Sequence, residues 1–286
     1  MTELLMYLTN GIVIGVIYAI SALGVTLIVG IMKVVNFAHG ELYVFAGYFS
    51  YYLSVSLGMS PLLAMPISVL LIFLVGILME KTLIRPTYGD DMYSLIVTFI
   101  LSIVLQNLAL LIFGPYPNKP PNLISGATNI FGLFYYGNQR LLSFFISLAI
   151  LLFIFYLIKM TWFGKSIRAV SQDREMAARM GIDHWRVNML SFGLGAALAG
   201  TAGVILSPIF PVTPSGSEAI SLTAFVVVVL GGMGSLKGCI VGGLTLGIIE
   251  NLGAAYVSTM YRGIFGFILL ILVLVFRPWG LYGQKT

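Results

Sequence analysis

The sequence predicts an all-α membrane protein, a polytopic bundle of about eight to ten transmembrane helices. Two observations carry this prediction. Of the 286 residues, 59% are hydrophobic and 9% are charged, and the mean hydropathy is +1.03, whereas a soluble domain devotes about a quarter of its residues to charge. The apolar residues also form blocks close to the roughly 20 residues that a helix needs to cross a hydrocarbon core. We therefore expect a single membrane domain over residues 1–286.

Nine apolar segments follow one another along the chain. Each is expected to form a helix, because lipid offers no partner to free peptide groups and the alternating pattern of a barrel strand is absent. The segments cover residues 10–31, 41–57, 62–80, 93–113, 141–160, 189–209, 219–233, 239–258 and 263–276. The second and the seventh are short, so they either span the membrane or form broken or re-entrant helices.

Lysine and arginine in the connections predict the orientation, because cytoplasmic connections carry the excess of positive charge. If the N-terminus lies outside, most of these residues are cytoplasmic: Lys33, Lys81, Arg85, Lys159, Lys165, Arg168, Arg174, Arg179, Arg186, Lys237, Arg277 and Lys285. Only Lys119, Arg140 and Arg262 then remain outside. This asymmetry predicts an outer N-terminus and a cytoplasmic C-terminus.

Two of the outer connections are rich in proline. One covers residues 114–121, and the other contains Pro208, Pro211 and Pro214. Proline ends helices and stiffens loops. These connections are therefore either simple helix terminators or a stiff platform on which an external partner docks.

The long polar stretch on the inner side covers residues 161–188. Ser171 is expected to cap a short helix that has Asp173 and Glu175 in its first turn, and Gly181 follows its end. Early acidic residues and a glycine after the last turn are typical of a helix whose dipole and terminal peptide groups are satisfied.

The same short helix has a small apolar side. Its members are Met176, Ala177, Ala178 and Met180. An apolar face exposed to the cytosol needs another surface to cover it. The alternative interpretation is an ordinary basic loop that only anchors the topology.

The order of residues from Arg168 to Ile182 resembles the coupling loop of permease subunits in ATP-binding cassette importers, with its Glu-Ala-Ala, three residues, Gly signature. It departs from that signature because Met176 stands between Glu175 and the alanine pair, and because two residues precede Gly181. This sequence pattern is similar to that of the branched-chain amino acid permease family. The resemblance implies that an ATP-binding subunit contacts Arg168, Asp173, Glu175, Ala177, Ala178, Met180, Gly181 and Ile182.

Three further blocks extend the resemblance along nearly the whole chain. They cover residues 15–24 (GVIYAISALG), 34–41 (VVNFAHGE) and 228–238 (VVLGGMGSLKG). Their sequences, and their order along the chain, resemble those of the first of the two paired permeases of the high-affinity branched-chain amino acid system. The expected fold is therefore that of an importer permease.

The resemblance implies how the work of transport is divided. Two homologous permease subunits form the path, two cytoplasmic ATP-binding subunits use ATP and Mg, and a periplasmic substrate-binding protein delivers the substrate. This chain is then expected to be a non-catalytic permease of a bacterial inner membrane, without a cofactor or a nucleic-acid partner, for the uptake of leucine, isoleucine and valine. Related permeases for urea or short amides share much of the pattern, and an ion-driven secondary carrier is the alternative from another class.

The residues themselves carry no enzyme signature. The run from Gly164 to Ser166 resembles the end of a phosphate-binding loop, but Lys159 stands where that loop requires its first glycine. Neither a His-Glu-x-x-His nor a Gly-x-Ser-x-Gly motif occurs. Cys239 is the single cysteine, which excludes an intrachain disulfide and does not by itself make a metal site.

Polar residues at membrane depth are costly, so they are candidates for function. Asn36, His39 and Glu41 lie in a break between two apolar segments, and a second break covers residues 231–238. Paired interruptions in two halves of a transporter point to a path between repeats. His39 either completes a hydrogen-bond network or takes part in gating, and Glu41 either lines the path or pairs with Lys33.

Two polar pairs fall inside predicted spans, Gln106 with Asn107 and Glu250 with Asn251. Such side chains either bridge helices or line a water-filled path. Glycines four residues apart also predict close contacts between helices. These are Gly11 with Gly15, Gly238 with Gly242, and Gly243 with Gly247.

Overall fold

The computed structural model describes residues 2–130, 132 and 134–283, and every predicted apolar segment in them is helical. The corresponding helices are α1 (Thr2–Met32), α2 (His39–Val55), α3 (Pro61–Met79), α4 (Asp91–Phe113), α5 (Asn138–Met160), α8 (His184–Leu206), α9 (Gly216–Gly231), α10 (Leu236–Tyr256) and α11 (Arg262–Phe276). The connection between α5 and α8 contains α6 (Trp162–Gln172) and α7 (Arg174–Arg179). Three short helical segments complete the described helices: η1 (Glu80–Ile84), η2 (Arg85–Thr87) and η3 (Thr259–Tyr261).

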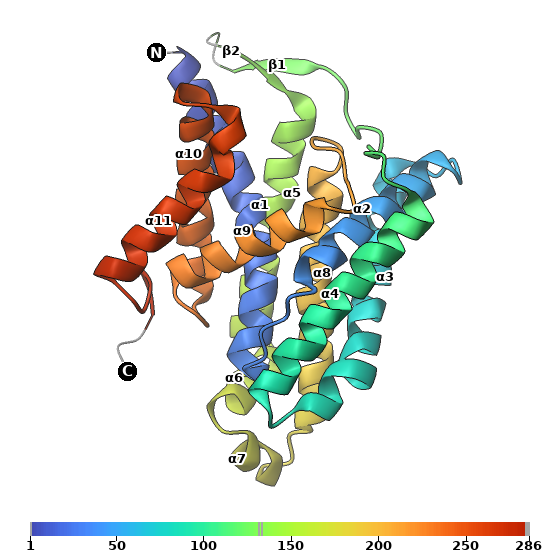
Figure 1. The fold of residues 1–286 in the computed structure, drawn as a ribbon, viewed down its shortest axis with the longest axis vertical. Helices are drawn as coiled ribbons and strands as arrows, with labels where there is room; N and C mark the ends of the chain where they lie inside the picture. The colour runs from blue at the N-terminus through green and yellow to red at the C-terminus, as the bar shows by residue number, and fades with distance from the viewer. Residues whose placement is uncertain (1, 131, 133, 284–286) are drawn as a thin grey trace.

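A small antiparallel hairpin, which the sequence did not predict, joins β1 (Ala127–Ile130) to β2 (Phe134–Gly137). In its register Ala127 pairs with Gly137 and Ile130 with Phe134. The hairpin stands at the same end of the bundle as the start of α1 (Figure 1). We call this end the hairpin end.

Seven helices of the described residues are long and apolar enough to cross a membrane. They are α1, α3 continued through η1 and η2, α4, α5, α8, α10, and α11 together with η3. The other two, α2 and α9, have 17 and 16 residues, which is below the roughly 20 residues of a full crossing. Both lie in the middle of the bundle, and α9 runs obliquely across it (Figure 1). The two segments predicted to be short are thus the two that fall below the length of a full crossing, since α11 reaches that length only together with η3.

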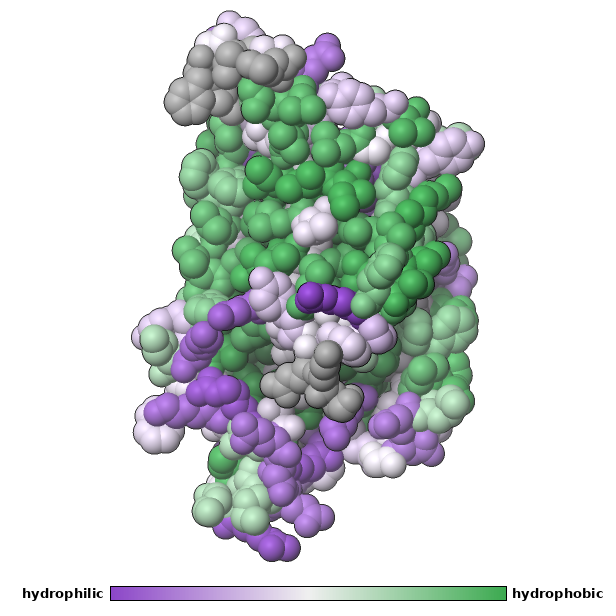
Figure 2. Space-filling model, turned by 90° about the vertical axis from the view of Figure 1, so that its left-hand side faces the viewer, coloured by the Kyte–Doolittle hydropathy of each residue, from purple (hydrophilic) through white to green (hydrophobic). Residues whose placement is uncertain are grey.

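The two ends of the molecule differ in charge. The hairpin end carries the connection after α4 and the starts of α5 and α11, where the three basic residues expected outside are found. At the opposite end, which we call the α7 end, α6 and α7 project from the bundle (Figure 1). Figure 2 shows an apolar belt around the middle and polar side chains gathered at the α7 end. Lys285, one of the residues expected in the cytoplasm, lies outside the described residues.

Helices α1 and α8 form the core of the bundle. In their most apolar stretches 83% and 78% of the residues are buried, against 11% in α4 and 6% in the η3–α11 segment. Glycine allows α1 to touch α10, because a Cβ added at Gly15 would lie only 2.7 Å from the carbonyl oxygen of Gly243. One added at Gly247 would lie 2.5 Å from the Cα of Gly15. The close contacts predicted from the glycine spacing are confirmed for these two helices.

The two breaks in the helices lie beside each other. Lys33 has a φ of 56° where α1 ends, and Gly232 has a φ of 99° where α9 ends. A Cβ added at Gly30 would lie 3.7 Å from the Cα of Gly234, so the second break adjoins the end of α1. At the start of α2, the backbone N–H of Gly40 donates to Ser221 Oγ of α9 at 2.8 Å. The second break therefore lies beside the end of α1, and the start of α2 is bound directly to α9.

The two proline-rich connections are joined at the hairpin end. Asn118 and Val212 exchange two backbone hydrogen bonds, with N···O distances of 3.0 and 2.8 Å. The connections after α4 and after α8 therefore form one continuous surface.

Candidate transport path and coupling helices

Helix α7 begins at a different cap from the one that the sequence predicted. Asp173 has extended backbone angles, and its Oδ1 accepts a hydrogen bond from Met176 N at 2.9 Å, so Asp173 is the N-cap. Ser171 is still within α6, where its hydroxyl donates to the carbonyl of Arg168. A serine inside a helix returns its hydroxyl to the preceding turn, which is why it does not cap the next helix.

The end of α7 agrees with the prediction. Gly181 has a φ of 84°, which is the left-handed conformation that glycine adopts after a helix. Its N–H donates to Ala178, and the N–H of Ile182 donates to Ala177, both at 3.0 Å. Glu175 and Arg179 form an exposed ion pair at 3.9 Å, which contributes little stability in water.

The apolar side of α7 divides into two parts. Ala177 is buried against the protein itself, whereas Met176, Ala178 and Met180 are exposed. We call these three residues the α7 face. A methionine that is 77% exposed, as Met180 is, is an adaptable contact for another protein surface.

A cluster of stacked side chains attaches α7 to the end of α3. Arg174, the first residue of α7, lies over the ring of Tyr88 at 4.9 Å, and Tyr88 stacks on Trp185 of α8 with ring centroids 5.6 Å apart. Arg85 also lies over this stack, 5.2 Å from the Trp185 ring. Tyr88 and Arg85 both bind the fully buried Glu80, at 2.9 and 3.0 Å. We call these five residues the stacked cluster.

Tyr88 keeps its proton in this setting. Burial, reinforced by the neighbouring Glu80 carboxylate, raises the pKa of Tyr88 well above its usual range. The phenol therefore remains a hydrogen-bond donor to Glu80.

Arg168 attaches α6 to α5, because its guanidinium donates to the carbonyl of Ile158 at the end of α5.

Asn36 and His39 hold the first break in place. His39 is fully buried and its Nε2 lies 3.0 Å from the carbonyl of Ser21 on α1. Asn36 Oδ1 accepts a hydrogen bond from Ala38 N at 3.0 Å. Both side chains therefore bind backbone groups. For His39 this corresponds to the first of its two predicted roles, the completion of a hydrogen-bond network.

Glu41 and Gln106 link α4 to the two short helices. Ser102 of α4 donates to Glu41 Oε1 at 3.1 Å, so Glu41 contacts α4 and not Lys33. Gln106 Nε2 donates to Glu218 Oε1 of α9 at 3.1 Å, and Glu218 is exposed. A carboxylate exposed at the middle of a bundle requires polar surroundings.

Glu250 joins three helices. Its Oε2 accepts hydrogen bonds from Tyr18 Oη of α1 at 3.0 Å and from Arg262 Nε of α11 at 3.3 Å. Asn107 and Asn251 behave differently, because each donates to a carbonyl of its own helix four residues earlier. Of the four polar residues predicted within spans, Gln106 and Glu250 thus bridge helices, and the two asparagines do not.

A cavity of about 130 Å³ lies between α1, α2, α8 and α9. We call it the inner cavity. Its lining is apolar except for a few hydroxyl-bearing side chains, and it consists of Ile17, Tyr18, Ser21, Tyr43, Ala202, Leu206, Ala219, Ile220, Thr223 and Ala224. Tyr18 therefore contributes both to this cavity and to the contact with Glu250.

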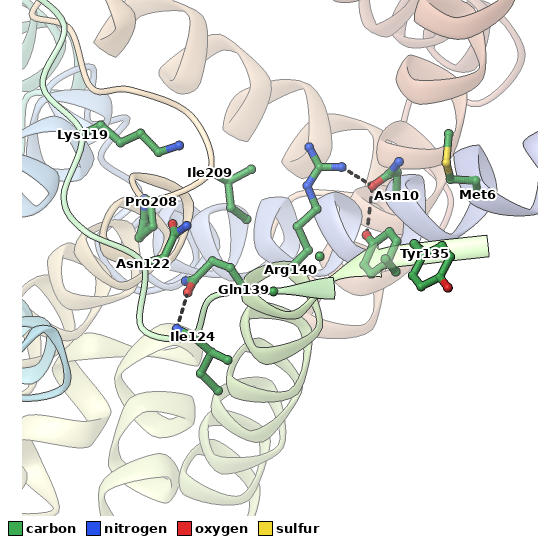
Figure 3. Close-up of a pocket in the computed structure, with 13 residues that line it drawn as sticks. Met6, Asn10, Lys119, Asn122, Ile124, Tyr135, Gln139, Arg140, Pro208 and Ile209 are labelled. Atoms are coloured by element: carbon green, nitrogen blue, oxygen red, sulfur yellow. Dashed lines mark hydrogen bonds between the residues drawn. The ribbon is translucent and has the colours of Figure 1, made fainter. Parts of the chain in front are cut away.

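A second pocket opens at the hairpin end, with a volume of about 370 Å³ (Figure 3). Arg140 Nη1 donates to Asn10 Oδ1 at 2.7 Å, and Gln139 Oε1 accepts from Leu123 N at 2.9 Å. Lys119, from the first proline-rich connection, also lines it (Figure 3). We call it the outer pocket, and two of its lining side chains are cationic.

Several of these residues were not found from the sequence. Ser102 and Glu218 carry no local motif, Tyr18 was quoted only as part of the block 15–24, and Arg262 was counted only as a loop charge. Their partners lie more than 60 residues away in three of the four cases, at separations of 232, 61 and 112. Only polarity within or beside an apolar segment could have pointed to them.

Comparison with known proteins gives one consistent picture. Residues 7–274 match the family described as branched-chain amino acid transport system, permease component. The chain is 34% identical to the high-affinity branched-chain amino acid transport system permease protein LivH of Escherichia coli strain K12, across 96% of this chain and 94% of LivH. It is 26% identical to LivM of the same organism, which has the same system name, across 93% of this chain and 67% of LivM.

The fold also has a counterpart among solved structures. A chain of PsaBC from Streptococcus pneumoniae in complex with Fab superimposes with a TM-score of 0.52 and 17% identity. The superposition covers 94% of this chain and 91% of that one. At this level of identity the likeness concerns the fold alone.

Proposed function

This chain belongs to the family of branched-chain amino acid transport system permease components, and we propose that it forms half of the membrane path of an ATP-driven importer. Its substrates in this proposal are leucine, isoleucine and valine. The observation that carries the proposal is the likeness to LivH along nearly the whole chain. The family and both relatives are named for branched-chain amino acids, so the alternative of urea or short amides is not favoured.

The second half of the path is a homologous permease. LivH and LivM of one organism share a system name, and this chain is similar to both. The face on which Gln106 and Glu218 meet, between α4 and α9, is the surface that the second permease covers. A polar group there needs water or a polar partner, and lipid supplies neither.

The ATP-binding subunits contact the α7 end of the molecule. The α7 face supplies exposed apolar contacts, while the stacked cluster ties α7 to η2 and α8. Closure of an ATP-binding subunit around α7 then moves α3 and α8 as well. Only a difference in binding between two conformations drives such a change. ATP and Mg are used by those subunits, and this chain is not a catalyst.

The substrate-binding protein docks at the hairpin end. The joined proline-rich connections form a stiff surface there, and the outer pocket presents Lys119 and Arg140 beside it. In this proposal the hairpin end lies outside and the α7 end lies in the cytoplasm of a bacterium, an orientation that the distribution of positive charge supports.

Uptake by the reconstituted complex tests this function. Proteoliposomes contain this chain, its homologous permease and the ATP-binding subunits, and receive the binding protein outside and ATP inside. We expect uptake of radiolabelled leucine, isoleucine and valine, and no uptake of urea. Urea uptake without leucine uptake would contradict the proposal, as would leucine uptake by this chain alone under an ion gradient.

A substitution on the α7 face tests the coupling role. Ala178→Glu places a charge in the contact with the ATP-binding subunit, and we expect the complex to hydrolyse ATP while leucine uptake falls. Ala178→Ser keeps the residue small and serves as the matched control, with uptake close to that of the wild type. Normal uptake by an assembled Ala178→Glu complex would show that α7 has been assigned wrongly.

A further inference from the structure

In the ion pair between Glu250 and Arg262, one carboxylate oxygen and one guanidinium nitrogen have no hydrogen-bond partner in the part of the chain that the structure describes. Both donors that reach Glu250, Tyr18 Oη and Arg262 Nε, bind the same oxygen, Oε2. The hydrogen bonds that Glu250 accepts within the described residues both end on Oε2 and none on Oε1, and Arg262 Nη2 is buried without a partner. The Glu250 side chain is 5% exposed. A buried guanidinium nitrogen without a partner is costly, so a ligand that binds Nη2 and the free Oε1 beside it would lower this cost.

The two unused atoms have opposite character. Oε1 is anionic and accepts hydrogen bonds, whereas Nη2 is cationic and donates them. An α-amino acid carries an ammonium group and a carboxylate on the same carbon atom. A zwitterion therefore satisfies both atoms at once through charge-assisted hydrogen bonds, whereas urea, which has no charge, offers only neutral ones.

The inner cavity adjoins this pair through a shared wall. Tyr18 lines the cavity with its ring and donates to Glu250 with its hydroxyl. On the other side, Leu206 lines the cavity, and Phe210, one turn further along, lies under the Arg262 guanidinium at 5.8 Å. The charged pair does not line the cavity of about 130 Å³ itself, but it contacts Tyr18, which does.

We propose that Glu250, Arg262 and the inner cavity form a substrate site within the permease. The carboxylate of the amino acid binds Arg262 Nη2, its ammonium group binds Glu250 Oε1, and its aliphatic side chain enters the cavity. This inference rests on the proposed function, because it takes an amino acid as the ligand. The permease then selects substrates itself, in addition to the selection made by the binding protein.

Equilibrium binding tests the charged part of the site. The complex of this chain, the second permease and the ATP-binding subunits is held in nanodiscs without the binding protein, and radiolabelled leucine is the probe. We expect saturable binding that weakens by about tenfold or more in Glu250→Gln and in Arg262→Gln, since each loses a charge-assisted hydrogen bond. Arg262→Lys, which keeps the charge, is expected to recover part of the affinity. Arg277→Gln, at the other end of α11, is the matched control and binds like the wild type.

A change of selectivity tests the cavity. Ala219 lines it and is exposed, so Ala219→Leu fills the space without touching either charge. We expect this variant to lose leucine binding relative to alanine binding by roughly 10-fold or more, in the range that one methylene contributes to discrimination in an apolar pocket. The wild type is expected to prefer leucine.

The outcomes separate this inference from the proposed function. Leucine affinity equal to the wild type in both charge variants would overturn the site, and so would the absence of saturable binding by the wild type. Where a charge variant does not assemble, an unchanged leucine-to-alanine preference in Ala219→Leu overturns it. In each of these cases ATP-driven leucine uptake by the wild-type complex would leave the proposed function standing.

Discussion

At the scale of single residues, three acidic or amide side chains in the apolar segments bind across helices. Glu41 binds Ser102, Gln106 binds Glu218, and Glu250 binds Tyr18. Each contact joins segments that are far apart in the chain. Lipid offers no alternative partner for these groups, so the links define which helices are neighbours.

One prediction at this scale concerns Tyr136 of the hairpin. Its hydroxyl donates to Asn10 at 2.9 Å, and burial raises the pKa of Tyr136 from 10.0 to about 12. A pKa that is higher in the folded state stabilises the fold below pH 10 and ceases to do so as the pH rises from 10 to 12. We expect the melting temperature of the wild type to fall more steeply in this interval than that of Tyr136→Phe.

The neighbouring tyrosine supplies the control for this measurement. Tyr135 is 73% exposed, so Tyr135→Phe is expected to follow the wild type across the same pH range. Equal slopes for all three proteins would show that ionisation of Tyr136 does not affect the fold.

The sequence predicts polar candidates better than it predicts their partners. Gln106 and Glu250 stand out because they interrupt apolar runs. Arg262 does not, because a basic residue in a connection first suggests topology. The contact between Arg262 and Glu250 depends on how α10 and α11 pack, and no spacing along the chain encodes it.

At the scale of elements, the cap of α7 is the sharpest difference between sequence and structure. Ser171 and Asp173 are both good capping residues. The choice depends on where α6 ends, and α6 continues through Gln172. Helix ends are decided by the packing of both neighbouring helices, so the sequence alone did not identify the cap.

The cap leads to a prediction for α7. Asp173→Ala removes the acceptor for Met176 N, which typically costs about 1 kcal/mol. We expect the amides at the start of α7 to exchange hydrogen faster in the assembled complex. Ser171→Ala, which removes only a bond within α6, is expected to leave their exchange unchanged. The reverse order of the two effects would favour Ser171 as the cap.

A second prediction at this scale concerns the contact between α1 and α10. Gly15→Ala places a methyl group 2.7 Å from the Gly243 carbonyl oxygen, and overpacking of this kind typically costs about 1–3 kcal/mol. We expect a lower melting temperature of the purified protein. Gly263→Ala is the matched control, because a Cβ there meets no atom within 4 Å. Equal melting temperatures for the two variants would contradict the close packing of these helices.

Hydropathy along the sequence predicts that two helices are short, but it does not predict that they contact each other. The apolar runs at 41–57 and 219–233 are visibly short, and α2 and α9 are indeed short helices. Their mutual contact is not visible in the sequence, because it depends on Gly40 lying against Ser217 and Ser221. Hydropathy did not predict the hairpin either, because its two strands have only four residues each.

At the scale of the whole molecule, the charge asymmetry gives a prediction about orientation. Cys239 is fully buried, so single cysteines introduced elsewhere report accessibility to a membrane-impermeant maleimide. We expect Tyr135→Cys, at the hairpin end, to react in intact spheroplasts. Met180→Cys, on the α7 face, is expected to react only after the membrane is permeabilised. The opposite pattern would invert the orientation and remove α7 from the cytoplasm.

The molecule as a whole is built to work with partners. Its core helices α1 and α8 are enclosed, whereas α4 and α11 expose most of their surfaces. Exposed apolar sides suit lipid or another subunit, and the polar contact of Gln106 with Glu218 suits water or another subunit but not lipid. The central claim is therefore that this chain is one half of an ATP-driven path for branched-chain amino acids.

Accumulation of leucine against its gradient tests that claim most directly. Proteoliposomes with the complete complex, external binding protein and internal ATP are compared with proteoliposomes from which only this chain is omitted. We predict accumulation that requires both this chain and hydrolysable ATP. Accumulation without this chain, or accumulation driven by an ion gradient in the absence of ATP, would contradict the account.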